Sequence, residues 1–165
     1  MVHAILSLGT NLGNRNKNMD EMVRLLKEIL QPPIKLSKLM ETEPVGTSDK
    51  QRWYLNCIVS GQYNGSARSL LKICRQIEKK LGRKDKNTFQ PRTADVDILL
   101  VDDCIITASD FIIPHPQILK RRFCMEGITS IEPDWIHPVE KKSFRELCET
   151  LDKHILKQKI RFIGI

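Results

Sequence analysis

The chain has no segment that marks a membrane-spanning or secreted protein. No apolar run approaches the roughly 20 residues that a membrane-spanning helix needs. The first residues lack a basic stretch followed by an apolar one, so no signal peptide is predicted. The five cysteines are odd in number and no two have C-x-x-C spacing, which favours reduced thiols near the core over disulfides or a metal cluster. We therefore expect a cytoplasmic protein without a membrane partner.

Common nucleotide-binding motifs are missing as well. The G-x-x-x-x-G-K-[ST] run of P-loop proteins does not occur, and the turn from Gly9 to Gly13 has no following lysine. The protein-kinase motifs are also absent. An enzyme that uses ATP with this sequence would therefore need a different kind of nucleotide site.

The size and charge of the chain are those of one basic globular domain. It has 165 residues, of which 41% are hydrophobic, which is enough for one core and short for two. We therefore predict a single domain that spans residues 1–165. The net charge of +7 and the pI of about 9.3 favour a polyanionic partner: a nucleic acid, an anionic membrane or a phosphorylated small molecule.

Hydrophobic spacing predicts the order strand, helix, strand, strand, helix, strand and then an extension. The predicted strands span residues 3–8, 34–42, 53–63 and 94–101. The predicted helices span residues 19–30, which Pro32-Pro33 would end, and 66–81, which Gly82 would end. This order is the split β-α-β pattern, so we predict an α+β fold, a ferredoxin-like α/β sandwich with a C-terminal extension.

The extension carries two further helix signals. A short helix is predicted around residues 118–125. The sequence Ser143-Phe-Arg-Glu146 has the form of a capping box and would begin another helix. The inward-facing residues of that helix would be Phe144, Leu147, Cys148, Leu151 and Ile155.

A carboxylate pair stands on the fourth predicted strand. Residues two apart in a strand point to the same face, so Asp95 and Asp97 project together, roughly 7 Å apart along the strand. Two carboxylates on one face suit a hard cation, and magnesium usually takes one or two carboxylates plus substrate phosphates. By spacing alone, two solvated aspartates on an edge strand are the simpler explanation. The residues that would face the core from this strand are Ala94, Val96, Ile98 and Leu100.

The residues before this pair favour a metal–nucleotide site. Arg92 lies three residues before Asp95, where its fork of donors can hold a phosphate. Pro91 stiffens the approach, and a basic loop that begins at Arg83 precedes it. Carboxylates that hold magnesium beside arginines that neutralise phosphate oxygens are typical of phosphate transfer.

Two other stretches suit a heterocycle or a phosphate. In Tyr54-Leu55-Asn56, the amide of Asn56 can donate and accept at once, as the edge of a heterocycle requires, although a structural turn amide is an equally good explanation. His115 and Arg121 lie about two helical turns apart and can both address a phosphate. Phe123 can stack on a ring, but packing in the core is the better explanation for a single phenylalanine.

Together these residues resemble one family, the 6-hydroxymethyl-7,8-dihydropterin pyrophosphokinases of folate biosynthesis. The matching segments occur in the family's order between residue 6 and about residue 138, and the Pro-Arg-Thr-x-Asp-x-Asp-Ile element is quite specific. The segments are Leu6-Ser-Leu-Gly-Thr-Asn-Leu-Gly13, Thr42-Glu-Pro-Val-Gly46, Tyr54-Leu-Asn56, Pro91-Arg-Thr-Ala-Asp-Val-Asp-Ile-Leu-Leu100 and Ile113-Pro-His-Pro116 with Arg121 and Phe123.

The resemblance implies a specific reaction on a ferredoxin-like fold. The pyrophosphoryl group of ATP would move to the hydroxymethyl oxygen of the dihydropterin, and AMP would be released. By resemblance, Asp95 and Asp97 bind two magnesium ions, and Arg83 and Arg92 are further catalytic residues. The residues implied for ATP are Glu78 near the ribose, Ile98, and, at the phosphates, Arg83, Arg92, His115 and Arg121. The residues implied for the pterin are Tyr54 and Phe123, which would sandwich it, and Asn56, Thr42, Pro44 and Val45, which would read its edge.

Two polar loops and several departures accompany the family pattern. The loops of residues 46–52 and 83–90 would be lids that exclude water. Gln90 stands where a glycine is usual, and Ala94 stands where the family has a larger apolar residue. Arg75 replaces a residue that is often polar and uncharged. These departures concern loop geometry and kinetics, and they leave the metal pair intact.

Two other functions agree with parts of the sequence. A basic ferredoxin-like domain can bind RNA, but only 5% of the residues are aromatic, and Asp95 and Asp97 would repel RNA phosphates. A degenerate relative that serves as a scaffold is disfavoured, because both aspartates, Arg92, Asn56 and His115 are retained. We therefore expect ATP and the dihydropterin as partners, without nucleic acid and without an obligate protein partner.

Overall fold

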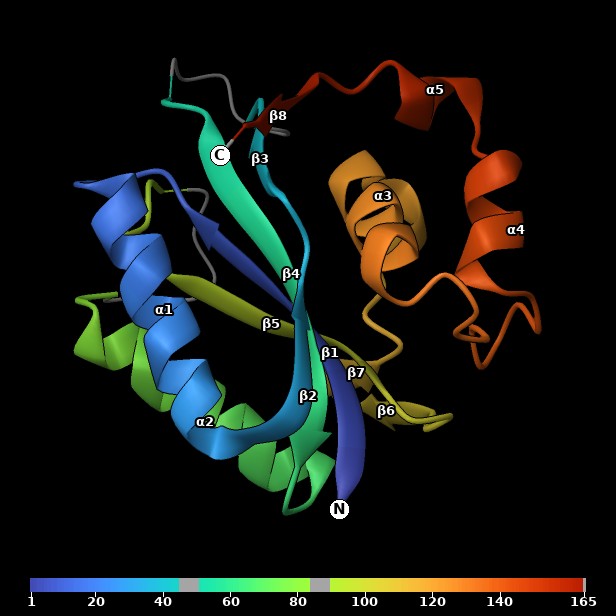
Figure 1. The fold of residues 1–165 in the computed structure, drawn as a ribbon, viewed down its shortest axis with the longest axis horizontal. Helices are drawn as coiled ribbons and strands as arrows, with labels where there is room; N and C mark the ends of the chain where they lie inside the picture. The colour runs from blue at the N-terminus through green and yellow to red at the C-terminus, as the bar shows by residue number, and fades with distance from the viewer. Residues whose placement is uncertain (45–50, 84–89, 165) are drawn as a thin grey trace.

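The structure is a computed structural model that describes residues 1–44, 51–83 and 90–164. An antiparallel sheet runs through its centre in the order β5-β1-β4-β3-β8, with β2 also paired to β4. Helices α1 and α2 lie on one side of the sheet, and α3 and α4 lie on the other (Figure 1). The strands are β1 (Val2–Thr10), β2 (Leu30–Leu36), β3 (Leu39–Thr42), β4 (Tyr54–Tyr63), β5 (Asp95–Val101) and β8 (Ile160–Ile163). The helices are α1 (Arg15–Ile29), α2 (Ala67–Lys80), α3 (Arg122–Ile131), α4 (Phe144–Glu149) and α5 (Lys153–Leu156).

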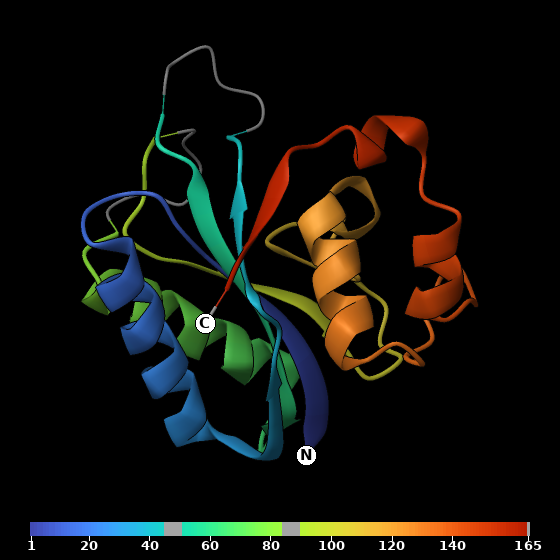
Figure 2. The same cartoon turned by 45° about the horizontal axis from the view of Figure 1, so that its top comes forward.

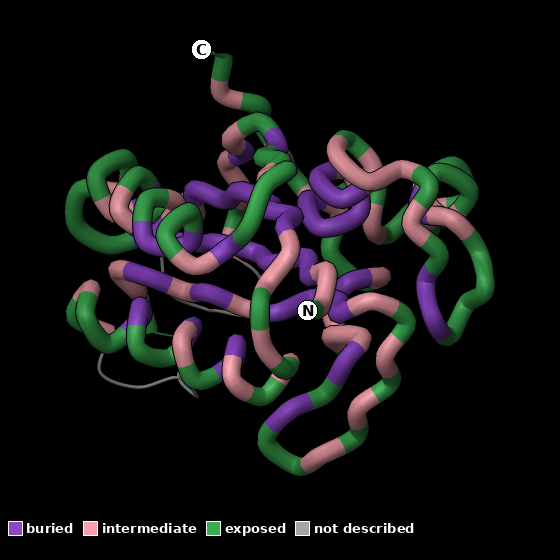
Figure 3. The backbone as a smooth tube through the Cα atoms, turned by 60° about the horizontal axis from the view of Figure 1, so that its bottom comes forward, coloured by how far each residue is buried: buried purple, intermediate pink, exposed green. Residues whose placement is uncertain are grey.

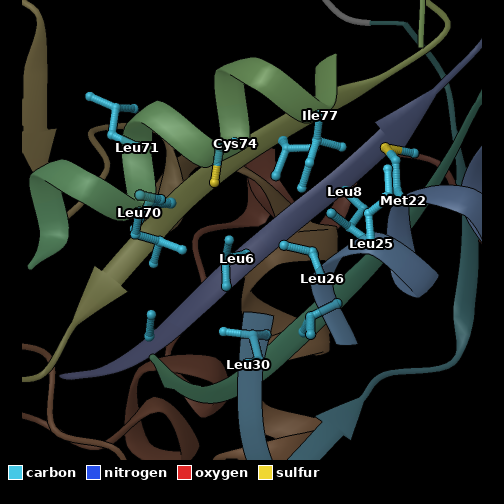
Figure 4. Packing of buried hydrophobic residues seen from close by; sticks show 14 of the residues in the cluster. Leu6, Leu8, Met22, Leu25, Leu26, Leu30, Leu70, Leu71, Cys74 and Ile77 are labelled. Carbon is cyan, nitrogen blue, oxygen red and sulfur yellow. The ribbon is translucent and has the colours of Figure 1, made fainter. Parts of the chain in front are cut away.

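The larger core lies between the sheet and the helices α1 and α2. Alternate residues of β1, among them Leu6 and Leu8, point into it because successive side chains of a strand face opposite ways. They meet Leu26 of α1 and Leu70 and Cys74 of α2 (Figure 4). Both helices begin at the polar residues that the sequence offers, Asn14 for α1 and, as predicted, Ser66 for α2. The first strand and the two helices are thus confirmed.

A second core lies on the opposite face, between the sheet, α3 and α4. Ile5 of β1 and Ile58 of β4 contribute to it from the sheet, and Met125 and Phe144 contribute from the helices. At Gly127 of α3, a Cβ atom would lie only 2.3 Å from the Cγ1 atom of Ile58, so glycine is needed for this close approach. Figure 3 shows the buried segments concentrated in the middle of the molecule, with exposed segments on its outer loops and helix turns.

The second predicted strand is wrong in its extent. Residues 34–42 do not form one strand, because β2 ends at Leu36 and β3 begins at Leu39. Pro32-Pro33 does not simply end α1 either: the helix ends at Ile29, and the two prolines lie inside β2. The pairing of β2 with β4 shifts register between Gln31 and Lys35, as expected where prolines offer no N–H to the ladder.

The fourth predicted strand is confirmed from Asp95 onward, but the prediction for Leu100 is wrong. The register between β1 and β5 shifts, because Ile5 pairs with Leu100 while Leu6 pairs with Ile98. This irregularity leaves Leu99 as an extra residue, so Leu100 joins the second core instead of the first. Ala94, Val96 and Ile98 face the α1–α2 core as predicted.

The C-terminal extension differs most from its prediction. The predicted helix around residues 118–125 is a 3₁₀ turn, η1 (Ile118–Lys120), followed by the start of α3. The capping box at Ser143 is confirmed, but α4 ends at Glu149, so Leu151 and Ile155 are not on that helix. A hairpin of β6 (Ile106–Ala108) and β7 (Phe111–Ile113) was not predicted. After α5, the chain returns to the sheet as β8 and pairs with β3 (Figure 2).

The fold is therefore a mixed α+β domain built on an antiparallel sheet. Among the described residues, no helix is both long and apolar enough to cross a membrane.

Candidate active site

A cavity of about 430 Å³ opens on the α3 side of the sheet. Its floor is the polar end of β1, β4 and β5, and its walls are the start of α3 and the segment that follows α5. Most of the residues predicted for the site line this single cavity. From the sheet side, the lining includes Ser7, Gly9, Tyr54, Asn56, Asp95 and Asp97.

Strand pairing explains why these residues converge. Gly9 of the central strand pairs with Asn56 on one side and with Asp95 on the other, so the three lie in one row across the sheet. Ser7 pairs with Asp97 in the next row on the same face. A Cβ atom at Gly9 would lie 3.2 Å from the Asn56 Oδ1 atom and 3.7 Å from the Asp95 Cβ atom. Glycine therefore leaves the floor open between the amide and the carboxylates.

Asp95 is held between two arginines. Arg92 Nη1 donates to Asp95 Oδ2 at 2.7 Å, and Arg83 Nη1 donates to the other carboxylate oxygen. The pKa of Arg92 is raised: burial would lower it, but the attraction of Asp95, Tyr54 and Asp97 outweighs that cost. The two arginines predicted to neutralise phosphates thus meet the carboxylate predicted to hold a metal.

Glu78 and Arg83 form a buried pair behind this carboxylate. Their side chains are each 5% exposed, and Arg83 Nη1 donates to Glu78 Oε1 at 2.7 Å. Glu78 Oε1 also accepts from the backbone N–H of Val96 at 2.9 Å, so it is fixed to β5 beside Asp95. Neither Glu78 nor Arg83 is among the residues that line the cavity. The ribose contact predicted for Glu78 stays a prediction.

Asn11 supports the site from outside the cavity lining, and its place in the sequence indicated no role beyond a turn and the first segment that matches the family. It is 1% exposed, and its Oδ1 atom accepts from the backbone N–H of Arg92 at 2.8 Å. Its own N–H donates to the Arg92 carbonyl at 3.0 Å, and its Nδ2 donates to the Arg52 carbonyl at 3.2 Å. Asn11 therefore fixes the backbone of Arg92. The signal was a short polar residue directly after a buried strand.

The other end of the cavity combines an amide, a hydroxyl and two aromatic rings. Asn56 is 4% exposed, and its Nδ2 donates to Thr42 Oγ1 at 2.8 Å, which fixes the amide. Tyr54 lies two residues before it on the same face. Burial, with a smaller contribution from Asp95, raises the pKa of Tyr54, so its ring is neutral at physiological pH. Phe123 fits both explanations given for it, because it belongs to the second core and also lines the cavity.

The remaining predicted residues fall into three groups. His115, Arg121 and Pro44 line the cavity, and His115 Nδ1 accepts from the Gln117 N–H at 3.2 Å, which leaves Nε2 as the donor of the neutral ring. Ile98 is 3% exposed and faces the α1–α2 core. Val45 and most of the two predicted lid loops lie outside the described residues.

A divalent cation fits the donor set of Asp95 and Asp97. Both side chains are on the cavity face of β5, and both offer only oxygen, the ligand that a hard ion prefers. Among the residues that the structure describes, no three His, Cys, Asp or Glu side chains converge on one point. Two carboxylates suffice for magnesium when phosphate oxygens and waters supply the other ligands.

The fold and the cavity together define a class of protein. An α+β domain has one cavity that is lined by a carboxylate pair, arginines, a fixed amide and two aromatic side chains. This arrangement is typical of enzymes that transfer phosphate from a nucleotide to a small heterocyclic acceptor.

Comparisons with known proteins narrow the class to one family. Residues 5–133 match the family model 7,8-dihydro-6-hydroxymethylpterin-pyrophosphokinase (HPPK). The chain is 33% identical over 157 residues to the 2-amino-4-hydroxy-6-hydroxymethyldihydropteridine pyrophosphokinase of Bacillus subtilis, covering 94% of this chain and 91% of that protein. The corresponding enzyme of Aquifex aeolicus is 32% identical over 146 residues, with 88% and 90% covered.

Longer relatives contain the same domain. The chain is 32% identical over 158 residues to the folic acid synthesis protein fol1 of Pneumocystis carinii, of which it covers 21%. A crystal structure of a triple mutant of Plasmodium falciparum HPPK-DHPS with pteroate matches 99% of this chain and 47% of that chain, with a TM-score of 0.72 at 16% identity, which shows a shared fold.

The chain belongs to the HPPK family of folate biosynthesis, and the resemblance inferred from its motifs is confirmed. Its activity is accordingly that of a 2-amino-4-hydroxy-6-hydroxymethyldihydropteridine pyrophosphokinase, which uses ATP.

Proposed function

We propose that the cavity transfers the pyrophosphoryl group of ATP to the hydroxymethyl oxygen of 6-hydroxymethyl-7,8-dihydropterin and releases AMP. The observation that carries this proposal is the row formed by Asn56, Gly9 and Asp95. This row puts the Asn56 amide, which would read the heterocycle, and the Asp95 carboxylate, which would bind the cation, on either side of an open glycine. The acceptor alcohol and the β-phosphorus would meet above Gly9, aligned for in-line attack.

The carboxylate end would hold the nucleotide. Two magnesium ions bound by Asp95 and Asp97 would neutralise phosphate oxygens and align the attacking and leaving oxygens. Arg92 and Arg83, which both donate to Asp95, would supply the positive charge that neutralises the phosphates beside this carboxylate. Arg121 and the Nε2 donor of His115 face the same cavity and would bind the terminal phosphates.

The amide end would hold the pterin. Asn56 is nearly inaccessible and fixed by Thr42, so its position does not have to be ordered when substrate binds. The rings of Tyr54 and Phe123 would stack on the two faces of the pterin, and Pro44 and the residues beside it would line its edge. Burial keeps Tyr54 neutral, which suits a stacking role.

The architecture around this site fits the ferredoxin-like sandwich predicted from the sequence. The order β5-β1-β4-β3, with α1 and α2 on one face, supports that assignment for the first hundred residues. A single domain over residues 1–165, cytoplasmic residence and the absence of a nucleic-acid or obligate protein partner stay predictions from the sequence.

An assay of nucleotide products tests the reaction. The protein is mixed with ATP, magnesium and 6-hydroxymethyl-7,8-dihydropterin, and nucleotides are separated over time. We expect AMP to appear in equal amount to the pterin diphosphate, and only when the pterin is present. Pterin-dependent ADP, or no nucleotide product from folded protein, would overturn the proposal.

The pterin assignment has its own test. Tyr54→Ala should raise the pterin KM by about tenfold, because stacking on an aromatic ring contributes on the order of 1 kcal/mol or more. Tyr63→Ala, which removes the other tyrosine at the far end of the same strand, is the control and should leave the pterin KM unchanged. Equal pterin KM values for the Tyr54 variant and the wild type would contradict the stacking role.

A further inference from the structure

The start of α3 lacks a cap of its own. The N-cap residue is Arg121, whose side chain makes no capping hydrogen bond and whose backbone is extended (φ −119°, ψ 115°). The N–H of Arg121 reaches the carbonyl of Ile118 only at 3.4 Å, a long hydrogen bond. The first N–H groups of a helix need an acceptor from outside the helix. The Arg121 carbonyl is held by the N–H groups of Cys124 at 3.1 Å and Met125 at 3.2 Å, so it is the peptide groups before and after this carbonyl, at Lys120 and Arg122, that depend on a partner from elsewhere in the chain.

The missing cap comes from Gln158, far along the chain. Gln158 Oε1 accepts from the N–H of Arg122 at 2.9 Å, and Gln158 Nε2 donates to the carbonyl of Lys120 at 2.7 Å. One amide thus holds the peptide groups on both sides of Arg121. Arg122 strengthens the link, because its Nη1 donates to the carbonyls of Leu156 at 3.0 Å and Gln158 at 3.3 Å.

The segment that carries Gln158 is also fastened to the opposite wall of the cavity. Directly after it, β8 pairs with β3, and Glu41 of β3 lies opposite Arg161. The Arg161 guanidinium lies 4.2 Å from the centre of the Trp53 ring, next to Tyr54. Figure 2 shows this segment passing from the α5 side back to the sheet. This segment therefore connects the start of α3 to the strands that carry the residues proposed to bind the pterin.

We propose that Gln158 is a positioning residue that fixes the backbone of Arg121 and so sets the place of its guanidinium in the cavity. The proposal rests on the proposed function, in which Arg121 binds ATP phosphates. The side-chain amide of Gln158 offers an acceptor to Arg122 and a donor to Lys120 at once. Gln158 lies beyond residue 133, where the match to the family model ends.

The test uses the full chain with Gln158→Met, which keeps the length of the side chain and removes both hydrogen bonds. We expect the backbone amide hydrogens of residues 121–124 to exchange with solvent faster in this variant than in the wild type. At saturating pterin, kcat/KM for ATP should fall about tenfold, because small misplacement of a binding group is costly. Lys153→Ala, an exposed change in the same segment, is the control and should alter neither quantity.

A double-mutant comparison separates positioning from general destabilisation. If Gln158 acts through Arg121, Gln158→Met should have little further effect on kcat/KM in an Arg121→Ala background. Full additivity of the two changes, unchanged amide exchange, or unchanged kcat/KM would each overturn the positioning role. Failure of the proposed function looks different: the wild type would then release no pterin-dependent AMP, and amide exchange alone would decide whether Gln158 holds the start of α3.

Discussion

The two faces of the central sheet use the same strands for different purposes. Toward α1 and α2, the strands present mainly apolar side chains, for example Leu6 and Leu8. Toward α3, the same strands change along their length, from Ile5 in the second core to Ser7 and Gly9 on the cavity floor. Because side chains alternate between faces, one strand can stabilise the fold and position the chemistry independently. Substitutions on the two faces should therefore separate stability from activity.

The largest effect is expected on the cavity face. Asp97→Asn removes one of the two carboxylates proposed to hold magnesium, so kcat for AMP release should fall on the order of 10³-fold. The free energy of unfolding should change little, because Asp97 belongs to neither core and the attraction to Arg92 that is lost is offset by weaker repulsion from Asp95. AMP release and urea unfolding measure the two quantities.

Asp103→Asn is the matched control for this variant. Asp103 is an exposed carboxylate shortly after β5 and does not line the cavity. The kcat of the Asp103→Asn variant should therefore equal that of the wild type. Near-normal turnover of Asp97→Asn would contradict the proposal that Asp97 holds magnesium.

The opposite face should show the reverse pattern. Leu6 is fully buried against α1 and α2, so Leu6→Ala should lower the free energy of unfolding by about 2–5 kcal/mol. The kcat of the folded fraction should change little, because Leu6 points away from the cavity. Urea unfolding and turnover at low temperature measure this.

Leu36→Ala on the edge strand provides the comparison for Leu6→Ala. Leu36 is 37% exposed, so its loss should have a much smaller effect on stability. If Leu6→Ala instead abolished turnover and left the free energy of unfolding unchanged, the proposed division between a stabilising face and a catalytic face would be wrong.

Glu78 should affect both stability and activity, because it connects the two faces of the sheet. It comes from α2 on the apolar side, yet it holds Arg83, which engages Asp95 on the cavity side. Glu78→Gln should lower the free energy of unfolding by about 3 kcal/mol, because it leaves a buried arginine with one charge partner fewer. It should also lower kcat.

The matched control for Glu78→Gln is Glu149→Gln, which neutralises an exposed glutamate at the end of α4 and should change neither stability nor kcat. A Glu78→Gln protein with wild-type stability would show that the buried pair is not structural.

The smallest effect concerns pH. Burial, with Asp97 adding to it and Arg121 opposing it, raises the pKa of Cys124 to about 12, against a model-peptide value of 9.0. The folded protein therefore binds more protons than the unfolded chain between these two values. The resulting stability is complete below pH 9 and is lost as the pH rises from 9 toward 12.

Urea unfolding at pH 8 and pH 10 tests the contribution of Cys124. The wild type should lose more stability between the two pH values than Cys124→Ala does, since the variant lacks this thiol. Equal losses in both proteins would contradict the burial of the thiol. Tyr54 and Cys57, whose pKa values are also raised, contribute equally to both proteins and cancel in the comparison.

The local signals of the sequence were enough for the sheet half of the site. The Asp95–Asp97 spacing and Arg92 were found because alternation and chain proximity place such residues without knowledge of the whole fold. Asn56 was left open by its local sequence and was assigned a role only through the family resemblance. The pairing of Gly9 with both Asn56 and Asp95 could not be predicted in the same way, because register depends on contacts between distant strands. The irregularity at Leu99 was missed for the same reason.

The structure of the chain after residue 143 was beyond such reasoning. The helix predicted from Ser143 stops at Glu149, because short helices depend on packing more than on propensity. The strand Ile160–Ile163 carries only four residues, too few for a clear pattern, and exists because β3 offers it an edge. Gln158 lies just before this strand, and its contact with the start of α3 depends on how the strand is placed in the folded protein.

The most direct test of the central claim follows the β-phosphorus of ATP. ATP labelled with ³²P at the β position is incubated with magnesium, the pterin and the protein, and the products are separated. Pyrophosphoryl transfer predicts that the label leaves the nucleotide and appears in the pterin product, with unlabelled AMP. Label retained in ADP, with a singly phosphorylated pterin, would contradict the account.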